Sequence, residues 1–283
     1  MAINAREIKT IENDTYIGEQ KDGQPHGDGT LTMANGDMYV GAFHEGQRHG
    51  NGKHTIKDSK QEYDGEWADG LPHGRGKEVN PAGDVYDGGF NEGKKHGPGK
   101  LVKVDGTTYD GAWSNGVPHG RGKETIKNGP TYDGEYENGL HNGPGKMTFS
   151  DGSIFEGNFV KGKRTDHGKH TNTDGDVYEG DFENNQRHGQ GKLTMKSANT
   201  SYEGAFMNGL PHGYGTFVNA EGDTYTGDFV SGKRHGQGTL TMQSGRVAFD
   251  GGWEDNQPHG QVAEITEKGD EYIGEFVNGK RHG

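Results

Sequence analysis

Histidine is the residue type whose spacing in this sequence first suggests chemistry. Ten of the fifteen histidines occupy one position of a recurring glycine-rich pattern: His26, His49, His73, His96, His119, His188, His212, His235, His259 and His282. Imidazole is a common zinc ligand, so a row of metal sites is one interpretation. If the pattern marks hairpins, equivalent residues lie about 10 Å apart, whereas each zinc ligand must reach the ion at about 2 Å. Neighbouring histidines therefore cannot share an ion. We expect no metal, and we expect each ring to fix a turn by hydrogen bonding.

Catalytic and phosphate-binding motifs are not supported either. Serine, histidine and acidic residues recur at equivalent places, whereas a nucleophilic or acid–base site needs one unique constellation. The glycine-rich tract 97–100 (GPGK) lacks Walker-A spacing and recurs as turn chemistry. We therefore expect no enzymatic activity and no cofactor.

The charge balance disfavours two classes of partner. The formal net charge is −13, which opposes non-specific nucleic-acid binding and weakens a general attraction to anionic membranes. Basic pairs do occur, and Lys94, Lys95, Lys233 and Arg234 are the candidates for contacts with phosphoinositide headgroups. Their alternative interpretation is solvated turns. We expect no nucleic-acid partner.

Composition also bears on the compartment. The chain has no cysteine, which rules out a disulfide framework and fits a reducing compartment. No apolar stretch approaches the roughly 20 residues of a membrane-spanning helix, and the first residues lack a signal-peptide pattern. These features predict a cytoplasmic protein.

A fixed period organises all of these residues. An aromatic residue is followed two positions later by glycine at twelve places, in steps of 23 or 24 residues: Tyr16, Tyr39, Tyr63, Tyr86, Tyr109, Tyr132, Phe155, Tyr178, Tyr202, Tyr225, Phe249 and Tyr272. Such a period is the signature of a repeat architecture, because a unit of this length is too small to fold alone. The chain is therefore predicted to be one array.

Each unit has the pattern of a β-hairpin. In the unit 225–242 (YTGDFVSGKRHGQGTLTM), two alternating runs flank a glycine-rich turn. Tyr225, Gly227 and Phe229 share one face of the first run, and polar residues occupy the other. The glycine after the aromatic residue never varies between units, which predicts close packing where a methyl group would clash.

Two further positions of the unit carry information. The glycine seven residues after the aromatic is replaced only by Asn185 and Asn256, which predicts a left-handed turn because asparagine tolerates positive φ. On the polar face, an acid after the aromatic residue faces a lysine of the second run. Such cross-strand pairs contribute about 0.2–1 kcal/mol each.

The unit Tyr-x-Gly-x-aromatic-x-x-Gly-x-x-His-Gly-x-Gly is whole in 63–76 (YDGEWADGLPHGRG) and in 109–122 (YDGAWSNGVPHGRG). It closely resembles the MORN (membrane occupation and recognition nexus) repeat, and the resemblance covers essentially the whole chain. It implies an all-β fold, an elongated single-layer antiparallel sheet of stacked hairpins twisted into a rod with an aromatic groove. We expect residues 1–15 to supply an N-terminal capping strand and 16–283 to form the array, its last unit incomplete.

Departures from the pattern are also informative. In repeat seven, Thr165 and Asp166 replace the usual His-Gly, which predicts a bend near residues 161–172. The residue before the histidine position is proline in repeats one, three, five, nine and eleven, and is basic in the even repeats, as in Arg48 and Lys95. The sequence alone supplies no physical reason for this alternation.

The resemblance implies a scaffold for other proteins. Proteins of the family occur in cilia and flagella, in cytoskeletal assemblies and at membranes, so we expect association with the cytoskeleton, the axoneme or the cytosolic face of a membrane. A protein partner, for example a helical peptide, would lie in the aromatic groove. The expected groove residues are Trp67, Phe90, Trp113, Tyr136, Phe159, Phe182 and Phe206.

Two alternatives and one assembly state stay open. The chain is alternatively a phospholipid-binding module, or the regulatory MORN domain of a larger enzyme. A stacked sheet exposes strand edges at its ends. We therefore expect a homodimer through the C-terminal edge, at Tyr272 and Phe276.

Overall fold

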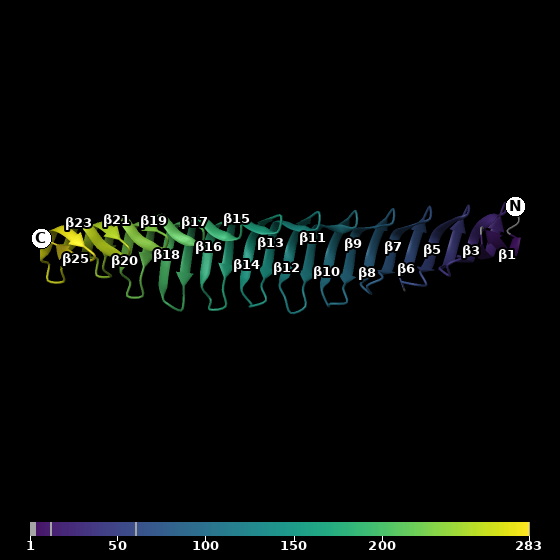
Figure 1. The fold of residues 1–283 in the computed structure, drawn as a ribbon, viewed down its shortest axis with the longest axis horizontal. Coiled ribbons are helices and arrows are strands. Elements are labelled where there is room, and N and C mark those ends of the chain that lie inside the picture. Colours follow the sequence, from purple (N-terminus) through teal and green to yellow (C-terminus); the bar gives the residue numbers. More distant parts are fainter. Residues whose placement is uncertain (1–3, 12, 60, 283) are drawn as a thin grey trace. The chain divides into compact units, whose positions relative to one another are not determined.

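Every regular element of this protein is a β-strand in the residues that the computed structural model describes, 4–11, 13–59 and 61–282. The predicted all-β hairpin fold is confirmed. The chain divides into two compact units, residues 1–141 and 142–283, and in each unit consecutive strands pair antiparallel as hairpins. Figure 1 shows that, within each unit, tight turns lie on one edge of the sheet and longer loops on the other.

The strands of the two units follow one another without interruption. The first unit contains β1 (Asn4–Ile11), β2 (Asp14–Lys21), β3 (Gln24–Thr32), β4 (Met38–His44), β5 (Gln47–Thr55), β6 (Glu62–Ala68), β7 (Leu71–Val79), β8 (Val85–Asn91), β9 (Lys94–Val102), β10 (Thr108–Ser114), β11 (Val117–Thr125) and β12 (Thr131–Glu137). The division falls within β13 (Leu140–Thr148). The second unit continues with β14 (Ile154–Val160), β15 (Lys163–Thr171), β16 (Val177–Glu183), β17 (Gln186–Met195), β18 (Thr200–Met207), β19 (Leu210–Val218), β20 (Thr224–Val230), β21 (Lys233–Thr241), β22 (Val247–Glu254), β23 (Gln257–Ile265), β24 (Glu271–Val277) and β25 (Lys280–His282).

Two-residue turns join the strands of each hairpin. Between β6 and β7, Asp69 and Gly70 both have positive φ, 49° and 80°. This is the conformation of a type I′ turn, whose twist matches that of the flanking strands. Asn185 and Asn256, which replace glycine at the second position, each have a φ of 73°. The prediction of a left-handed turn is therefore confirmed.

Aspartates tie the longer loops of neighbouring hairpins together. Asp84 Oδ1 accepts a hydrogen bond of 3.0 Å from the backbone nitrogen of Val104, which lies in the next loop. Because the acceptor is ionised and the donor is a backbone amide, this is one of the stronger hydrogen bonds in the loops. The same bond is made by Asp37, Asp176 and Asp223.

Facing glycines allow a tyrosine ring to lie on the sheet. Gly88 in β8 is opposite Gly99 in β9, and a Cβ atom on Gly88 would lie 2.4 Å from Gly99 Cα and 2.6 Å from Tyr86 Oη. The Tyr86 ring is fully buried over this pair and donates a hydrogen bond of 3.0 Å to the Gly89 carbonyl. The predicted clash is confirmed, and it recurs at Gly65, Gly111 and Gly180.

Repeat seven keeps the register of the other hairpins. Thr165 in β15 is opposite Asn158 in β14, as His235 is opposite Asp228 in repeat ten. Asp166 takes the place of the usual glycine with a φ of 53°, a left-handed conformation that aspartate tolerates. The expected bend at this repeat therefore has no counterpart in the strand pairing.

The strand β1 pairs antiparallel with β2, with Glu7 opposite Gly18 and Ile11 opposite Asp14. Residues 1–3 and 12 of the predicted N-terminal capping segment lie outside the described residues, as does Gly283 at the other end. The backbone of 4–11 thus extends the first sheet by one strand.

Candidate partner-binding site

One face of each sheet carries a row of interlocked aromatic rings. Tyr86 contacts Phe90 of its own hairpin edge to face, with ring centroids 5.2 Å apart, and Trp113 of the next hairpin at 5.1 Å. Such pairs contribute about 0.5–1.5 kcal/mol each beyond the burial of their area. Burial raises the pKa of Tyr86 to about 12, so its phenol is neutral at physiological pH. The same edge-to-face contact with a ring of the next hairpin is made by Tyr63, Tyr109, Tyr178, Tyr202 and Tyr225.

Basic side chains lie over these rings. The guanidinium carbon of Arg48 is 4.3 Å from the ring centroid of Trp67, and Lys95 Nζ is 5.0 Å from that of Tyr86. Cation–π contacts of this kind contribute about 0.5–2 kcal/mol. In the second unit the basic residues at this cap position are Arg164, Arg187, Arg234 and Arg281.

The basic caps of the even repeats are matched to the tryptophans. All three tryptophans follow a repeat whose cap is basic: Arg48 lies over Trp67, Lys95 over Trp113 and Arg234 over Trp253. Each indole Nε1 also donates to a glycine carbonyl of the preceding hairpin, at 2.8–3.0 Å. The tryptophans of repeats three, five and eleven thus lie beneath the longer side chain of the even repeat before each of them.

The aromatic side is hollowed within the second unit. A hollow of about 500 Å³ extends from β15 to the turn after β18. The rings of Tyr178 and Phe182 line it together with Leu193 and Met195, and Arg164, Arg187 and His170 add positive or titratable groups. Its remaining lining is polar: Asn172, Asp176, Asn185, Gln186 and Asn208. An apolar floor with polar rims is the usual chemistry of a groove that takes a peptide.

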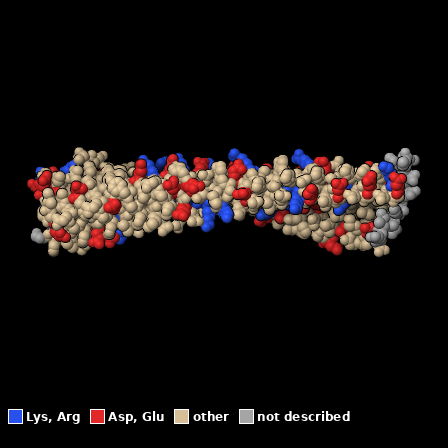
Figure 2. Space-filling model, turned by 90° about the horizontal axis from the view of Figure 1, so that it is seen from above, with Lys and Arg blue, Asp and Glu red and all other residues tan. Residues whose placement is uncertain are grey.

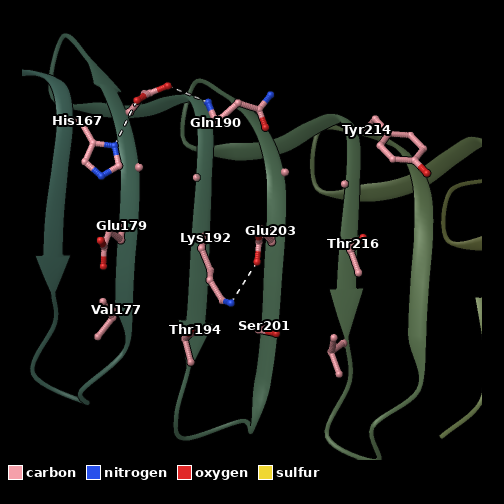
Figure 3. A pocket seen from close by; sticks show the side chains of 16 residues that line it. His167, Val177, Glu179, Gln190, Lys192, Thr194, Ser201, Glu203, Tyr214 and Thr216 are labelled. Atoms are coloured by element: carbon pink, nitrogen blue, oxygen red, sulfur yellow. Dashed lines mark hydrogen bonds and ion pairs between the residues drawn. The ribbon is translucent and has the colours of Figure 1, made fainter.

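The opposite face of the same strands carries the acid–lysine ladder. A shallow hollow of about 980 Å³ lies on this face, and in it Lys192 Nζ is 3.1 Å from Glu203. Figure 3 shows this pair, with the ring of Tyr214 at one side. His167 Nδ1 lies 3.6 Å from Asp181, whose other oxygen accepts a hydrogen bond from the Gln190 backbone. The predicted cross-strand pairing of acids with lysines is confirmed in this pair and at Lys146.

Neither hollow has the arrangement of a catalytic or metal site. In the described lining of the two hollows, no hydroxyl is hydrogen-bonded to a histidine or carboxylate that could act as its base. No group of three or more metal-ligating side chains converges in residues 13–59 and 61–282. What the faces offer is contact area, charge and hydrogen-bonding groups, which suits binding.

Comparison with known families assigns the repeats. The family model of the MORN repeat matches residues 16–38, 39–60, 63–85, 86–108, 109–131, 132–154, 155–177, 178–199, 202–224, 225–245, 249–261 and 272–283. The chain belongs to the MORN repeat family. The resemblance proposed from the sequence is thereby confirmed along its whole length. No curated protein sequence matches the chain.

Solved structures similar to this MORN protein are distant. The chain is similar to the TCP10 domain of Danio rerio CPAP in complex with a peptide of Danio rerio STIL, at 12% identity and a TM-score of 0.39, over 96% of this chain and 100% of that one. It is also similar to the SAS-4 (dCPAP) TCP domain of Drosophila melanogaster in complex with a proline-rich motif of Ana2 (dSTIL), at 14% identity and a TM-score of 0.30, over 68% and 84%. At these TM-scores the similarity carries no inference about binding.

The expected groove residues of the MORN repeats are buried. Trp67, Phe90, Trp113, Tyr136, Phe159, Phe182 and Phe206 are only 1–6% exposed. The aromatic groove expected at these residues is closed at the rings themselves, because each ring packs against its neighbours in the row, and Trp67, Trp113, Phe182 and Phe206 also lie beneath a basic cap. Of the seven, only Phe182 lines the hollow on this side. A partner on this side would therefore touch mainly the residues that cover the rings.

Sequence reasoning missed those covering residues. Arg164, Arg187, Leu193 and Met195 all line the hollow. The available signal was the break in the alternation of caps, because repeat seven has Arg164 where an odd repeat otherwise has proline.

The repeated histidines have a smaller role than expected. Among the described repeats, only His188 and His259 have a carboxylate within ion-pair distance, at 3.5 and 3.3 Å. The backbone carbonyl at this position does accept a hydrogen bond: Tyr63 Oη donates to the His73 oxygen at 3.3 Å. The expectation that each ring fixes its turn by hydrogen bonding is therefore wrong for most repeats.

Most of the candidate phospholipid contacts are engaged within the protein. Lys95 Nζ forms an ion pair of 2.8 Å with Glu78, Lys233 forms one of 2.9 Å with an aspartate of the next turn, and Arg234 caps rings. Lys94 is exposed. On the face shown in Figure 2, basic side chains lie in small groups beside acidic ones. No helix in the described residues is long and apolar enough to cross a bilayer.

At the expected dimer edge, Phe276 is buried against Phe249 and Tyr272, with ring centroids 6.2 and 5.5 Å away. The strand β24 pairs with β23 on one side, and β25 pairs with its residues 275–277 on the other. Association through this edge stays a prediction, and light scattering at micromolar concentration tests it.

Proposed function

We propose that this MORN protein is a non-enzymatic scaffold that binds a segment of a partner protein on the aromatic side of its hairpins. In this proposal it helps to organise a cytoskeletal, ciliary or membrane-associated structure, the settings that the family resemblance implies. The observation that supports the proposal is the hollow lined by Tyr178, Phe182, Leu193 and Met195. It joins an apolar floor to polar rims on an otherwise closed face.

An amphipathic segment suits this chemistry. Its apolar side chains would contact Leu193 and Met195, which lie beside the buried Tyr178 ring, while its polar side would meet the amides of the rim. Helix-in-groove recognition uses this division of roles. The hollow on the opposite face is less suited, because Glu179, Lys192 and Glu203 would have to lose water on contact.

Two neighbouring residues of β17 allow a matched test. Leu193 is on the aromatic side, and Lys192 is on the polar face, where it pairs with Glu203. We expect Leu193→Asp to remove the partners that the wild-type protein captures in cells, and Lys192→Asp to keep them. With a purified partner, Leu193→Asp should weaken binding at least tenfold, about 1.4 kcal/mol.

Circular dichroism and thermal melting of both variants verify that the fold is kept. Retention of all partners by Leu193→Asp, or their selective loss in Lys192→Asp, would reject the aromatic side as the binding face. Failure of the wild-type protein to recover any specific partner, against a capture with an unrelated repeat protein, would reject the scaffold function itself.

A further inference from the structure

Two consecutive repeats place arginine over the aromatic row at the hollow. Arg164 in β15 and Arg187 in β17 are one repeat apart, and both line the hollow on the aromatic side. After Arg48, Lys95 and Arg234, the cap position of the next repeat is proline. The hollow is thus the one place in the sequence where two permanently charged caps are adjacent.

The two guanidinium groups differ in how they are satisfied. Arg164 lies 5.3 Å from the Phe182 ring centroid and donates from Nη2 to the Asn185 carbonyl at 2.7 Å. Arg187 lies 5.6 Å from both the Tyr178 and the Phe206 centroids. Within the described residues, Arg187 has neither a carboxylate within ion-pair distance nor a side-chain hydrogen bond. Its five donors therefore have no acceptor from the protein.

Comparison with equivalent arginine caps shows that the missing hydrogen-bond acceptor is particular to Arg187. Arg48 donates to the Gly70 carbonyl at 2.9 Å, and Arg234 donates to the Asn256 carbonyl at 2.8 Å. Each acceptor belongs to the turn of the next hairpin. The corresponding turn residue for Arg187 is Gly209, which also lines the hollow. Here the guanidinium lies at the hollow without that bond.

The described lining of the hollow carries two guanidinium groups and one carboxylate. Burial lowers the pKa of both Arg164 and Arg187, and the pKa of His170 is lowered first by burial and then by these two cations. Asp176 also lines the hollow, but its two oxygens accept hydrogen bonds from the Lys196 backbone and from an asparagine amide. The result is a local positive site in a chain of net charge −13.

We propose that this hollow binds a carboxylate side chain from an acidic segment of the partner protein, bonded to the guanidinium group of Arg187, with Arg164 one repeat away adding positive charge to the site. The planar fork of arginine matches a carboxylate in two parallel hydrogen bonds. The apolar neighbours of the bound acid contact Leu193 and Met195. The location of the site rests on the proposed partner-binding function, and the chemistry of the ligand is added here.

The lining favours a singly charged ligand. Asp176 lies in the same hollow, and its charge opposes a dianionic phosphate more than a carboxylate. Asn185 and Asn208 on the rim are neutral and offer donors to a carboxylate of either Asp or Glu. A phosphoserine segment and a phosphoinositide headgroup are therefore outcomes that the test must separate from a carboxylate.

Side-chain NMR of the full chain provides the test. N-acetyl-glutamate amide is titrated while the guanidinium signals of Arg187, Arg164 and Arg234 are followed, with the glutamine analogue as the neutral control. We expect a saturable shift at Arg187, with a dissociation constant of about 1 mM for a ligand of this size, and a smaller shift at Arg164. Arg234 should not shift, because it makes the same turn bond as Arg164 and has no second arginine cap one repeat away.

The variant Arg187→Lys keeps a cation over the rings, as Lys95 does in repeat four, and removes the fork. Carboxylate binding to this variant should weaken by about tenfold. Equal shifts at all three arginines, or binding of only inorganic phosphate or phosphoserine, would overturn the proposal.

A second readout separates this proposal from the partner-binding function. With a captured partner in hand, loss of binding in Leu193→Asp but not in Arg187→Lys would overturn the carboxylate site and keep the groove. If Arg187 shows a carboxylate-dependent shift but partners bind both variants as well as the wild type, the anion site is supported and the groove is rejected as the place where partners bind.

Discussion

Replacing Gly88 by alanine tests whether crowding between ring and backbone sets the repeat. The new Cβ atom would lie 2.4 Å from Gly99 Cα, 2.6 Å from Tyr86 Oη and 2.8 Å from the Pro98 carbonyl. Two of these neighbours are backbone atoms of the paired strand, and the third is a buried hydroxyl, so none can move cheaply. Overpacking in cores typically costs 1–3 kcal/mol, and we expect about 3 kcal/mol here.

Gly70→Ala is the matched control in the same unit. Gly70 has a φ of 80°, and a methyl group at this position would have no atom within 4 Å, so alanine there meets a conformational penalty without a clash. That penalty is about 1–2 kcal/mol. The expected order of destabilisation is therefore Gly88→Ala above Gly70→Ala, by at least about 1 kcal/mol.

Hydrogen exchange is the suitable assay, because each hairpin contacts mainly its neighbours and local opening is resolved along the chain. A cost of 3 kcal/mol reduces amide protection in β8 and β9 by about a hundredfold, while the distant strand β2 stays protected. If Gly88→Ala lowers amide protection in β8 and β9 no more than Gly70→Ala lowers it in β6 and β7, the crowding argument is wrong.

Three more predictions follow from particular contacts. Trp113→Phe should cost about 1–2 kcal/mol in urea unfolding, because it loses the Nε1 hydrogen bond of 3.0 Å to the Gly99 carbonyl and part of the surface under Lys95; an unchanged midpoint would contradict this. Hydrogen bonds, chiefly from the Val104 amide, hold the pKa of Asp84 below its usual range. Its contribution to stability is therefore present above the unfolded pKa near 4 and lost as pH falls through the lower folded value; Asp84→Asn should flatten the acid limb of a melting-temperature profile. Burial raises the pKa of the Tyr202 phenol to about 12, so stability that is complete below pH 10 should fall as pH rises towards 12, with phenolate absorbance appearing together with unfolding; reversible titration of the buried tyrosines near pH 10 in the folded protein would refute the burial.

The period and register could be predicted because they depend on short-range chemistry. The glycine two residues after Tyr86 indicates that the tyrosine ring packs on its own hairpin. The asparagine at position 185 indicates a left-handed turn from its residue type alone. Both features lie within one repeat. The family match then follows from the same residues, as the hairpin pattern does.

The burial of the aromatic row could not be predicted in the same way. The solvent exposure of Trp113 depends on Lys95, which lies over its ring, and on Tyr86, which contacts the ring edge to face. Lys95 and Tyr86 belong to the repeat before that of Trp113. A single-layer sheet leads one to expect an open face, but long side chains can supply the missing layer. The alternation of caps was visible in the sequence, and its meaning required the direction of each side chain.

The arginine cap of repeat seven has a physical consequence that depends on the distance between caps. Equivalent residues of adjacent hairpins lie two strands apart, about 10 Å, so caps that alternate with proline lie about 19 Å apart. The screening length at physiological ionic strength is about 8 Å, so charges at the larger spacing act almost independently. Arg164 and Arg187 stand at the smaller spacing over a half-buried hollow, where screening is weaker and their fields add. Because Arg164 stands where an odd repeat otherwise has proline, two neighbouring caps form one site with excess positive charge. An acidic residue from outside the chain would balance that charge.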